Sequence, residues 1–239
     1  GLPLAAVVAL LAACLPLLLL WRLFTPHLVW PRLLLVGFCR IAGLRIRRRG
    51  QRAPGGAFLL ANHVSWADIP ALSAQAGAAF VAHDGLTAVP LVHWLCRQND
   101  TVFVARHDRA SVRSQVEQVR QAIRESGALA IFPEGTTSDG TGLLAFKSSL
   151  LSALVPVPEG IAVQPVLLDY GREAGDVAWV GEEHGLDNFL RILARARPVE
   201  LTVHFLPPLA GAALTNRKAI AAAAQAAIAA AQRDQRVTL

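Results

Sequence analysis

Cysteine and charged residues are both scarce in this chain. Cys14, Cys39 and Cys96 form neither a CxxC pair nor an even disulfide framework, which favours a reducing compartment and argues against disulfides and structural zinc. Charged residues make up 17% of the 239 residues, whereas apolar residues make up 54%. The chain is therefore unusually apolar, long enough for one sizeable core and too short for two ordinary domains.

Acidic side chains are fewer than basic ones, 17 against 23, which gives a formal net charge of +6 carried almost wholly by arginine. A basic protein is attracted to anionic surfaces, and both phospholipid headgroups and nucleic acid have that charge. The arginines gather in the segment RIRRRG at residues 45–50. One interpretation is therefore a non-enzymatic module that binds membranes or nucleic acid.

The first fifty residues contain the longest apolar run. Residues 2–21 carry no charge, and about twenty apolar residues just span a bilayer as a helix. A secretory signal is less favoured, because no basic segment precedes the run and no small-residue cleavage site closes it. Residues 30–49 are apolar and then basic, which is typical of a helix at a membrane interface whose arginine-rich end is cytoplasmic.

We therefore expect membrane-anchoring helices over residues 1–50, on the cytoplasmic face of the inner (plasma) membrane, and a globular domain over residues 51–239. The alternative is that both apolar segments are core helices of a larger globule, but the first run has no polar face.

Short apolar runs alternate with helical periodicity after residue 52. This alternation predicts an α/β fold, with a single mixed sheet flanked by helices. The runs expected to be strands are residues 57–61, 80–82, 101–105, 128–132, 161–168 and 199–206. The helical patterns cover residues 69–75, 91–98, 110–125 and 186–196, and an alanine-rich closing helix covers residues 216–232.

The segment NHVSWAD, residues 62–68, follows the end of a predicted strand, where ligands bind in an open α/β sheet. His63 and Asp68 are five positions apart, so they would lie on different faces of one continuous helix. They meet only if His63 is in the loop and Asp68 begins the next helix, and Pro70 favours that start. Asp68 would then orient the imidazole and leave its other nitrogen free as a base.

A second polar segment, IFPEGTTSDG at residues 131–140, also ends a predicted strand. Gly135 permits close approach of the backbone, and the amides around Gly135 and Thr136 are candidates to face a phosphate or a developing oxyanion. Glu134 is a candidate to bind a hydroxyl or to fix the loop. Alone, the segment would be interpreted as an ordinary polar turn.

Together, NHxxxxD and the FPEGT about seventy residues later resemble the glycerophospholipid acyltransferase family, which includes 1-acylglycerol-3-phosphate acyltransferase. VFVAR at residues 102–106 is similar to the family's block between these motifs, and QPV at residues 164–166 to its proline-containing strand. Four blocks in the family's order cover residues 58–168. The resemblance also implies an α/β core with membrane-docking helices at the N-terminus.

The resemblance implies that His63 is the general base for attack of an acceptor hydroxyl on an acyl thioester, with Asp68 orienting it. Arg106 and Lys147 would hold the headgroup of a lysolipid acceptor, and the loop with Glu134, Gly135 and Thr136 would help to bind or polarise the substrate. It implies no metal, no cofactor and no covalent acyl-enzyme. The acyl donor would be a thioester of acyl carrier protein or coenzyme A, and an anionic membrane surface rather than nucleic acid would be the partner.

Two positions depart from the family pattern. Thr137 stands where the family often has arginine, and Thr101 replaces a common glycine. Losing a cationic fork weakens the case for a phosphate dianion, and TTSDG followed by FKSSLL resembles the branch that includes lyso-ornithine-lipid O-acyltransferases. Because Arg106 and Lys147 remain, we rank lysophosphatidate first as acceptor, for the synthesis of phosphatidic acid, and lyso-ornithine lipid second.

A serine hydrolase is a different enzyme class that uses similar residue types. Ser65 lies close to His63, and Ser138 lies in the second polar segment. The sequence contains no GxSxG nucleophile elbow, however, and no HExxH zinc motif. The hydrolase is therefore less favoured than the acyltransferase, and so is the non-enzymatic module, which leaves His63 and Asp68 unexplained.

Overall fold

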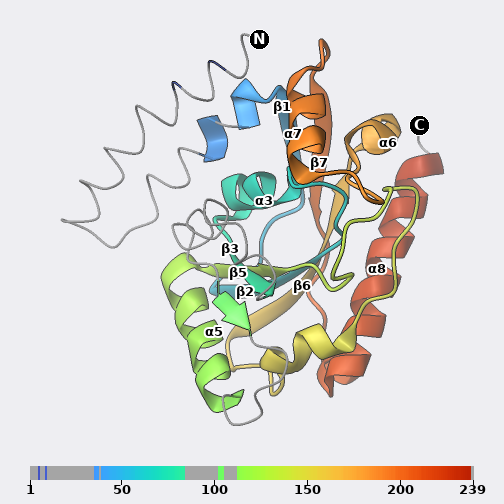
Figure 1. Cartoon of the computed structure of the whole chain (residues 1–239). Helices are drawn as coiled ribbons and strands as arrows, with labels where there is room; N and C mark the ends of the chain where they lie inside the picture. Colours follow the sequence, from blue (N-terminus) through green and yellow to red (C-terminus); the bar gives the residue numbers. More distant parts are fainter. Residues whose placement is uncertain are drawn as a thin grey trace.

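The computed structural model describes residues 39–83, 102–104 and 112–237, together with residues 5, 9 and 35–37. In this part of the chain one seven-stranded sheet has the order β1-β7-β6-β2-β5-β3-β4 (Figure 1). The strands are β1 (Leu44–Arg49), β2 (Gly56–Ala61), β3 (Ala79–His83), β4 (Val102–Val104), β5 (Ala128–Ile131), β6 (Ile161–Asp169) and β7 (Val199–Phe205).

The sheet is mixed, as predicted. Strand β2 pairs in parallel with β5 on one side and with β6 on the other, whereas β7 runs antiparallel to β6. The carboxyl ends of β2, β5 and β6 therefore meet at one edge of the sheet. The segments NHVSWAD and IFPEGTTSDG leave β2 and β5 at this edge, so the topology brings the two sequence motifs together.

Helices cover both faces of the sheet, as the apolar strands require. The helices are α3 (Asp68–Ala76), α5 (Val112–Ser126), α6 (Ala174–Val177), α7 (Gly185–Leu193) and α8 (Arg217–Val237), with short 3-10 turns η3 (Ser148–Leu154), η4 (Gly171–Glu173) and η5 (Gly211–Leu214). Helices α3 and α7 pack on one face, and α5 and α8 on the other (Figure 1).

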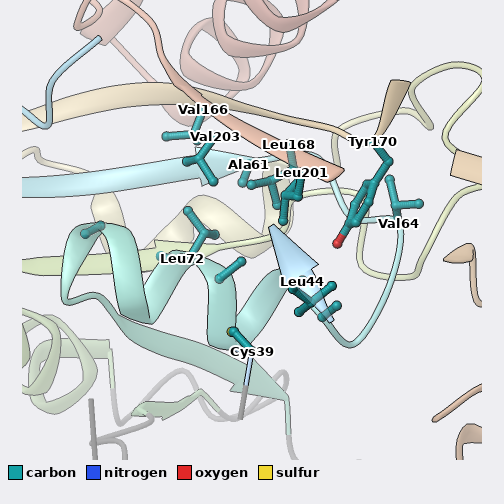
Figure 2. Packing of buried hydrophobic residues seen from close by; sticks show 14 of the residues in the cluster. Cys39, Leu44, Ala61, Val64, Leu72, Val166, Leu168, Tyr170, Leu201 and Val203 are labelled. Atoms are coloured by element: carbon teal, nitrogen blue, oxygen red, sulfur yellow. The ribbon is translucent and has the colours of Figure 1, made fainter. Parts of the chain in front are cut away.

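Strand β2 shows how the core is divided. Leu59 points to the α3 face and Leu60 to the α8 face, because successive side chains of a strand alternate. On the α3 face, Leu72 of the helix lies against side chains from β2, β6, β7 and β1 (Figure 2). Leu59 and Leu60 are both fully buried, so β2 lies between two hydrophobic clusters and contributes to each.

Most of the predicted elements are confirmed. The expected strands agree with β2 to β7 within a few residues, and the helical patterns at 69–75, 110–125, 186–196 and 216–232 correspond to α3, α5, α7 and α8. The helix predicted over residues 91–98 lies outside the described residues, and so does nearly all of the apolar run at 2–21. Among the residues that are described, we find no helix with the length and apolar character needed to cross a bilayer.

The helix predicted over residues 30–49 is wrong at its arginine-rich end. Residues 44–49 form β1, which pairs in parallel with β7. Leu44 is buried and Ile46 is partly buried in the α3 cluster, whereas Arg45 and Arg47 are exposed, and this period-two alternation is the signature of a strand. The sheet thus begins inside the segment that the sequence analysis assigned to the membrane anchor.

Candidate active site

The loop that follows β2 is fixed to the neighbouring strand by Asn62. Its side-chain amide donates to the carbonyl of Leu168 at 3.0 Å and its side-chain oxygen accepts from the Leu168 N–H at 2.7 Å. Asn62 is buried, so it extends the pairing between β2 and β6 by one side chain. His63 therefore leaves the sheet from a fixed point.

His63 and Asp68 meet as the motif predicts. Nδ1 of His63 lies 2.8 Å from Oδ2 of Asp68, and α3 begins at Asp68. The same oxygen accepts the backbone N–H groups of Val64 at 2.7 Å and Ser65 at 2.9 Å. Asp68 is fully buried. The two backbone bonds fix its carboxylate within the turn that joins it to His63.

The other carboxylate oxygen of Asp68 has a partner from a distant part of the chain. Tyr170, which directly follows β6, donates its hydroxyl to Oδ1 of Asp68 at 2.5 Å. Tyr170 is buried next to Val64 (Figure 2). Burial first, and the charge of Asp68 second, raise the pKa of Tyr170 well above its ordinary value, which keeps the hydroxyl protonated as a donor.

The imidazole of His63 is held on one side and open on another. Phe132 stacks on the ring, with centroids 4.0 Å apart and planes 13° apart. The side chain remains 17% exposed and lines a pocket of about 310 Å³. With Asp68 ionised, Nδ1 carries the proton, and Nε2 is the unprotonated nitrogen available to a substrate.

Glu134 fixes the backbone beneath this site. It is fully buried, and its two oxygens accept the N–H groups of His63 and Leu144, each at 3.0 Å. Burial is the main cause that raises the pKa of Glu134. Ser138 completes the connection by donating its N–H to the His63 carbonyl at 2.7 Å. Of the two roles considered for Glu134, the contacts therefore support fixing the loop, because backbone amides occupy both oxygens.

The remaining predicted residues differ in how close they come to His63. Thr136 lines the same pocket. The Gly135 N–H closes a turn onto the Phe132 carbonyl at 3.0 Å, and its φ of +69° suits glycine. Lys147 lies over Gly135, since a Cβ there would come within 3.1 Å of Lys147 Nζ, but Lys147 does not line the pocket. Arg106 lies outside the described residues.

A third segment, which the sequence analysis did not assign to the site, forms the rim of the pocket. Residues 179–183 all line it. The Trp179 N–H donates to the Val64 carbonyl at 3.0 Å, and the Thr137 hydroxyl donates to the Trp179 carbonyl. Two acidic residues, Glu182 and Glu183, belong to this rim. Glu182 is exposed, and it lies beside His63 across the pocket.

Two carboxylates, those of Glu182 and Glu183, are among the described residues that line this pocket. Glu183 pairs with Arg191 at 2.9 Å and also accepts from Asn188, which lowers the pKa of Glu183. No lysine or arginine is among the described residues that line the pocket. Within the same part of the chain, no group of three or more His, Cys, Asp or Glu side chains is arranged to hold a metal ion.

Comparison with known proteins agrees with this arrangement. The family model described as Acyltransferase matches residues 44–169. The chain is 32% identical to a lyso-ornithine lipid O-acyltransferase of Rhodobacter capsulatus, across 84% of this chain and 76% of that protein. It is 33% identical to a 1-acyl-sn-glycerol-3-phosphate acyltransferase of Neisseria gonorrhoeae, across 56% of this chain and 51% of that protein.

The fold also has a counterpart among solved structures. The 1-acyl-sn-glycerophosphate (LPA) acyltransferase PlsC of Thermotoga maritima superposes with a TM-score of 0.71, covering 98% of this chain and 95% of that one. The two sequences are 18% identical, so the likeness concerns the fold alone.

Proposed function

Because this chain belongs to the acyltransferase family, we propose that it moves a fatty acyl group from an acyl thioester to the free hydroxyl of a lysolipid, with His63 as the general base. The observation that carries this proposal is the pairing of His63 Nδ1 with the buried Asp68, which leaves Nε2 for the substrate at a pocket. Ser138 is not supported as a nucleophile, because its hydroxyl donates to the His63 carbonyl at 3.1 Å and not to the ring.

The reaction needs one proton to move twice. Nε2 of His63 takes the proton of the acceptor hydroxyl as its oxygen attacks the thioester carbonyl. The imidazolium that forms is stabilised by Asp68, which is already aligned with Nδ1. When the tetrahedral intermediate collapses, the thiolate leaves and the imidazolium returns the proton to sulfur or to solvent. Collapse breaks the C–S bond and leaves the acyl group as an ester, through the C–O bond that the attack formed.

We assign the stabilisation of the oxyanion to the loop that carries Thr136. Thr136 lines the pocket with His63, and no backbone partner of its N–H is found among the described residues. The neighbouring Gly135 amide is engaged in its turn and is not free for this role. A preorganised amide near the reacting carbonyl stabilises the charge that develops in the transition state.

For the acceptor, we now rank an amine-bearing lysolipid, of which lyso-ornithine lipid is the example, above lysophosphatidate. Glu183 is already paired with Arg191, so among the described residues that line the pocket Glu182 is the carboxylate that favours a cationic headgroup over a phosphate dianion. Thr137 occupies the position where a cationic fork would serve a phosphate, and it also lines the pocket. A relative that aligns with 84% of this chain is named for lyso-ornithine lipid.

Lysophosphatidate, which the sequence analysis ranks first, becomes the second candidate. Lys147 lies over the Gly135 turn, within reach of a headgroup that approaches this loop, and Arg106 follows β4 by two positions. A relative that aligns with about half of this chain is named for 1-acyl-sn-glycerol-3-phosphate.

We also propose that the enzyme works on the cytoplasmic face of the inner membrane. Its acceptor is a lipid, and the apolar run at residues 2–21 supplies an anchor. The donor is a thioester of acyl carrier protein or coenzyme A. Both donors are acidic, and the net charge of +6 favours their approach as well as that of an anionic membrane surface.

An acceptor panel tests the proposed function. The purified full chain is given a labelled acyl thioester with either lyso-ornithine lipid or lysophosphatidate, and the acylated product is counted. We expect transfer to lyso-ornithine lipid. No transfer to either lysolipid, under conditions where the protein is folded, would refute the assignment.

Two variants then test the acceptor. Glu182→Gln should raise the KM for lyso-ornithine lipid and leave that for the donor unchanged, whereas Glu159→Gln, an exposed carboxylate at a turn before β6, should change neither. Thr137→Arg should reduce use of lyso-ornithine lipid by like-charge repulsion, with Thr137→Gln as the uncharged control. If Thr137→Arg improves transfer to lysophosphatidate and the wild type prefers that acceptor, the second candidate replaces the first.

A further inference from the structure

Among the described residues, four donors contact the carboxylate of Asp68, and one of them comes from outside its own turn. His63, Val64 and Ser65 donate to Oδ2. Tyr170 donates to Oδ1 from the far end of β6, 102 residues away in sequence. The three donors on Oδ2 lie in the loop that carries the catalytic base, whereas Tyr170 directly follows β6.

We propose that Tyr170 is a positioning residue for acyl transfer, because its hydroxyl withdraws negative charge from Asp68 and thereby limits how tightly Asp68 holds a protonated His63. This inference rests on the proposed role of His63 as the base. The Tyr170 hydroxyl touches neither the pocket lining nor a reacting atom, so it acts only through Asp68.

The chemical reason lies in how a carboxylate shares its charge. A donor on Oδ1 stabilises the ionised form and draws charge away from Oδ2. Without it, the charge concentrates on Oδ2, its attraction for the imidazolium increases, and His63 stays protonated at higher pH. A protonated His63 cannot accept the proton of the acceptor hydroxyl, so less of the enzyme is active at a given pH.

The hydroxyl also fixes the carboxylate in space. Asp68 has no exposed surface, so an Oδ1 without a donor is an unsatisfied buried acceptor. Rotation of the carboxylate to relieve it would disturb the contact between Oδ2 and His63 Nδ1. Both consequences point in the same direction, which is a lower rate of proton transfer at a given pH.

Other titratable groups lie near His63, Asp68 and Tyr170 and are kept in a variant at Tyr170. Glu134 accepts from the backbone N–H of His63, and Glu182 and Glu183 line the pocket with the ring. Cys39 also faces Tyr170. Burial raises the pKa of Cys39 to about 12, so this thiol stays neutral throughout the working range of pH.

Tyr170→Phe removes the hydroxyl and keeps the ring. We expect the acid limb of kcat/KM against pH to move upward by roughly one pH unit, since a hydrogen bond to a charged group is about that large on the pKa scale. The KM for the acceptor and the donor should stay near the wild-type values. A purely structural role predicts a lower melting temperature with the pH profile unchanged, and that result would overturn the proposal.

A second perturbation has the opposite sign and spares the fold. Tyr170 is the only tyrosine in the sequence, so growth on 3-fluorotyrosine changes this residue alone. Fluorine makes the phenol a stronger donor, and the acid limb should then move to lower pH. If Tyr170→Phe does not fold, this measurement decides: an unmoved acid limb in the fluorinated enzyme overturns the proposal.

The same profiles separate this inference from the function on which it rests. A wild-type acid limb that disappears in His63→Ala, together with no shift in either tyrosine variant, defeats only the role of Tyr170. A wild-type enzyme without any acid limb defeats the assignment of His63 as the base, and the inference fails with it.

Discussion

Glu134 offers the sharpest test of how the site is supported, because it binds two backbone amides without touching the pocket. Its oxygens accept from His63 and from Leu144 at 3.0 Å each. In Glu134→Gln, the amide oxygen can keep one of these bonds, but the NH₂ group then faces the other N–H, donor against donor. One charge-assisted bond is lost, and a buried N–H is left without an acceptor.

The free energy of unfolding of Glu134→Gln should be lower than that of the wild type by about 1.5–3 kcal/mol, the range for a hydrogen bond to a charged group. For a chain of this length that corresponds to a melting temperature lower by about 3–12 °C. Burial raises the pKa of Glu134, so the ionised carboxylate carries a desolvation cost that glutamine avoids. We therefore expect a value near the lower end of that range.

The effect on catalysis should be larger than the effect on stability. The His63 N–H is one of the two donors, so its displacement moves the imidazole, and a shift of about 1 Å in a catalytic group costs on the order of 10²-fold in rate. The assay measures kcat with saturating acceptor and donor, beside a thermal melt, with Glu159→Gln as the exposed control. Wild-type kcat and melting temperature in Glu134→Gln would refute this account of the residue.

Three further predictions concern other contacts. Gly140→Ala should lower the melting temperature, since φ is +74° and the new Cβ would lie 2.7 Å from Ala174 Cβ; an unchanged melt would contradict the crowding. Burial is the main cause that lowers the pKa of His204 in the folded protein. Protonation of His204 therefore favours the unfolded state, and the free energy of unfolding falls as the pH drops from the unfolded-state pKa toward the lowered folded-state pKa. His204→Gln should reduce the slope of the unfolding free energy against pH, measured in denaturant titrations between pH 7 and 5. The reduction is at most about 1.4 kcal/mol per pH unit, the limit for one titrating group. An identical slope would exclude His204 as its source. Asp68→Asn should stay folded, because its oxygen can still accept from Val64 and Ser65, yet lose about 10²–10⁴-fold in kcat; near-normal turnover would remove the charge of Asp68 from the mechanism.

The residues that could be predicted from the sequence are those whose signals are local. The apolar run at 57–61 is a buried strand because both faces of β2 are covered. The pairing of His63 with Asp68 followed from a spacing of five and a helix start at Asp68. These features depend on neighbours within one turn or one strand, which a sequence pattern records directly.

What the sequence did not reveal depends on contacts across the sheet. Tyr170 reaches Asp68 only because β6 lies beside β2. The rim at residues 179–183 reaches His63 through the bond between Trp179 and Val64. In β1, the arginine cluster masks the alternation of Leu44 and Ile46, and the strand is evident only from its pairing with β7.

The measurement that tests the central claim most directly is the rate of acyl transfer by His63→Ala. Purified variant and wild type are compared at saturating labelled thioester and lysolipid, with a thermal melt to verify the fold. Loss of a general base predicts a fall of about 10²–10⁴-fold in kcat, with a melting temperature near the wild-type value. A folded His63→Ala variant whose kcat falls by less than about tenfold would contradict the account.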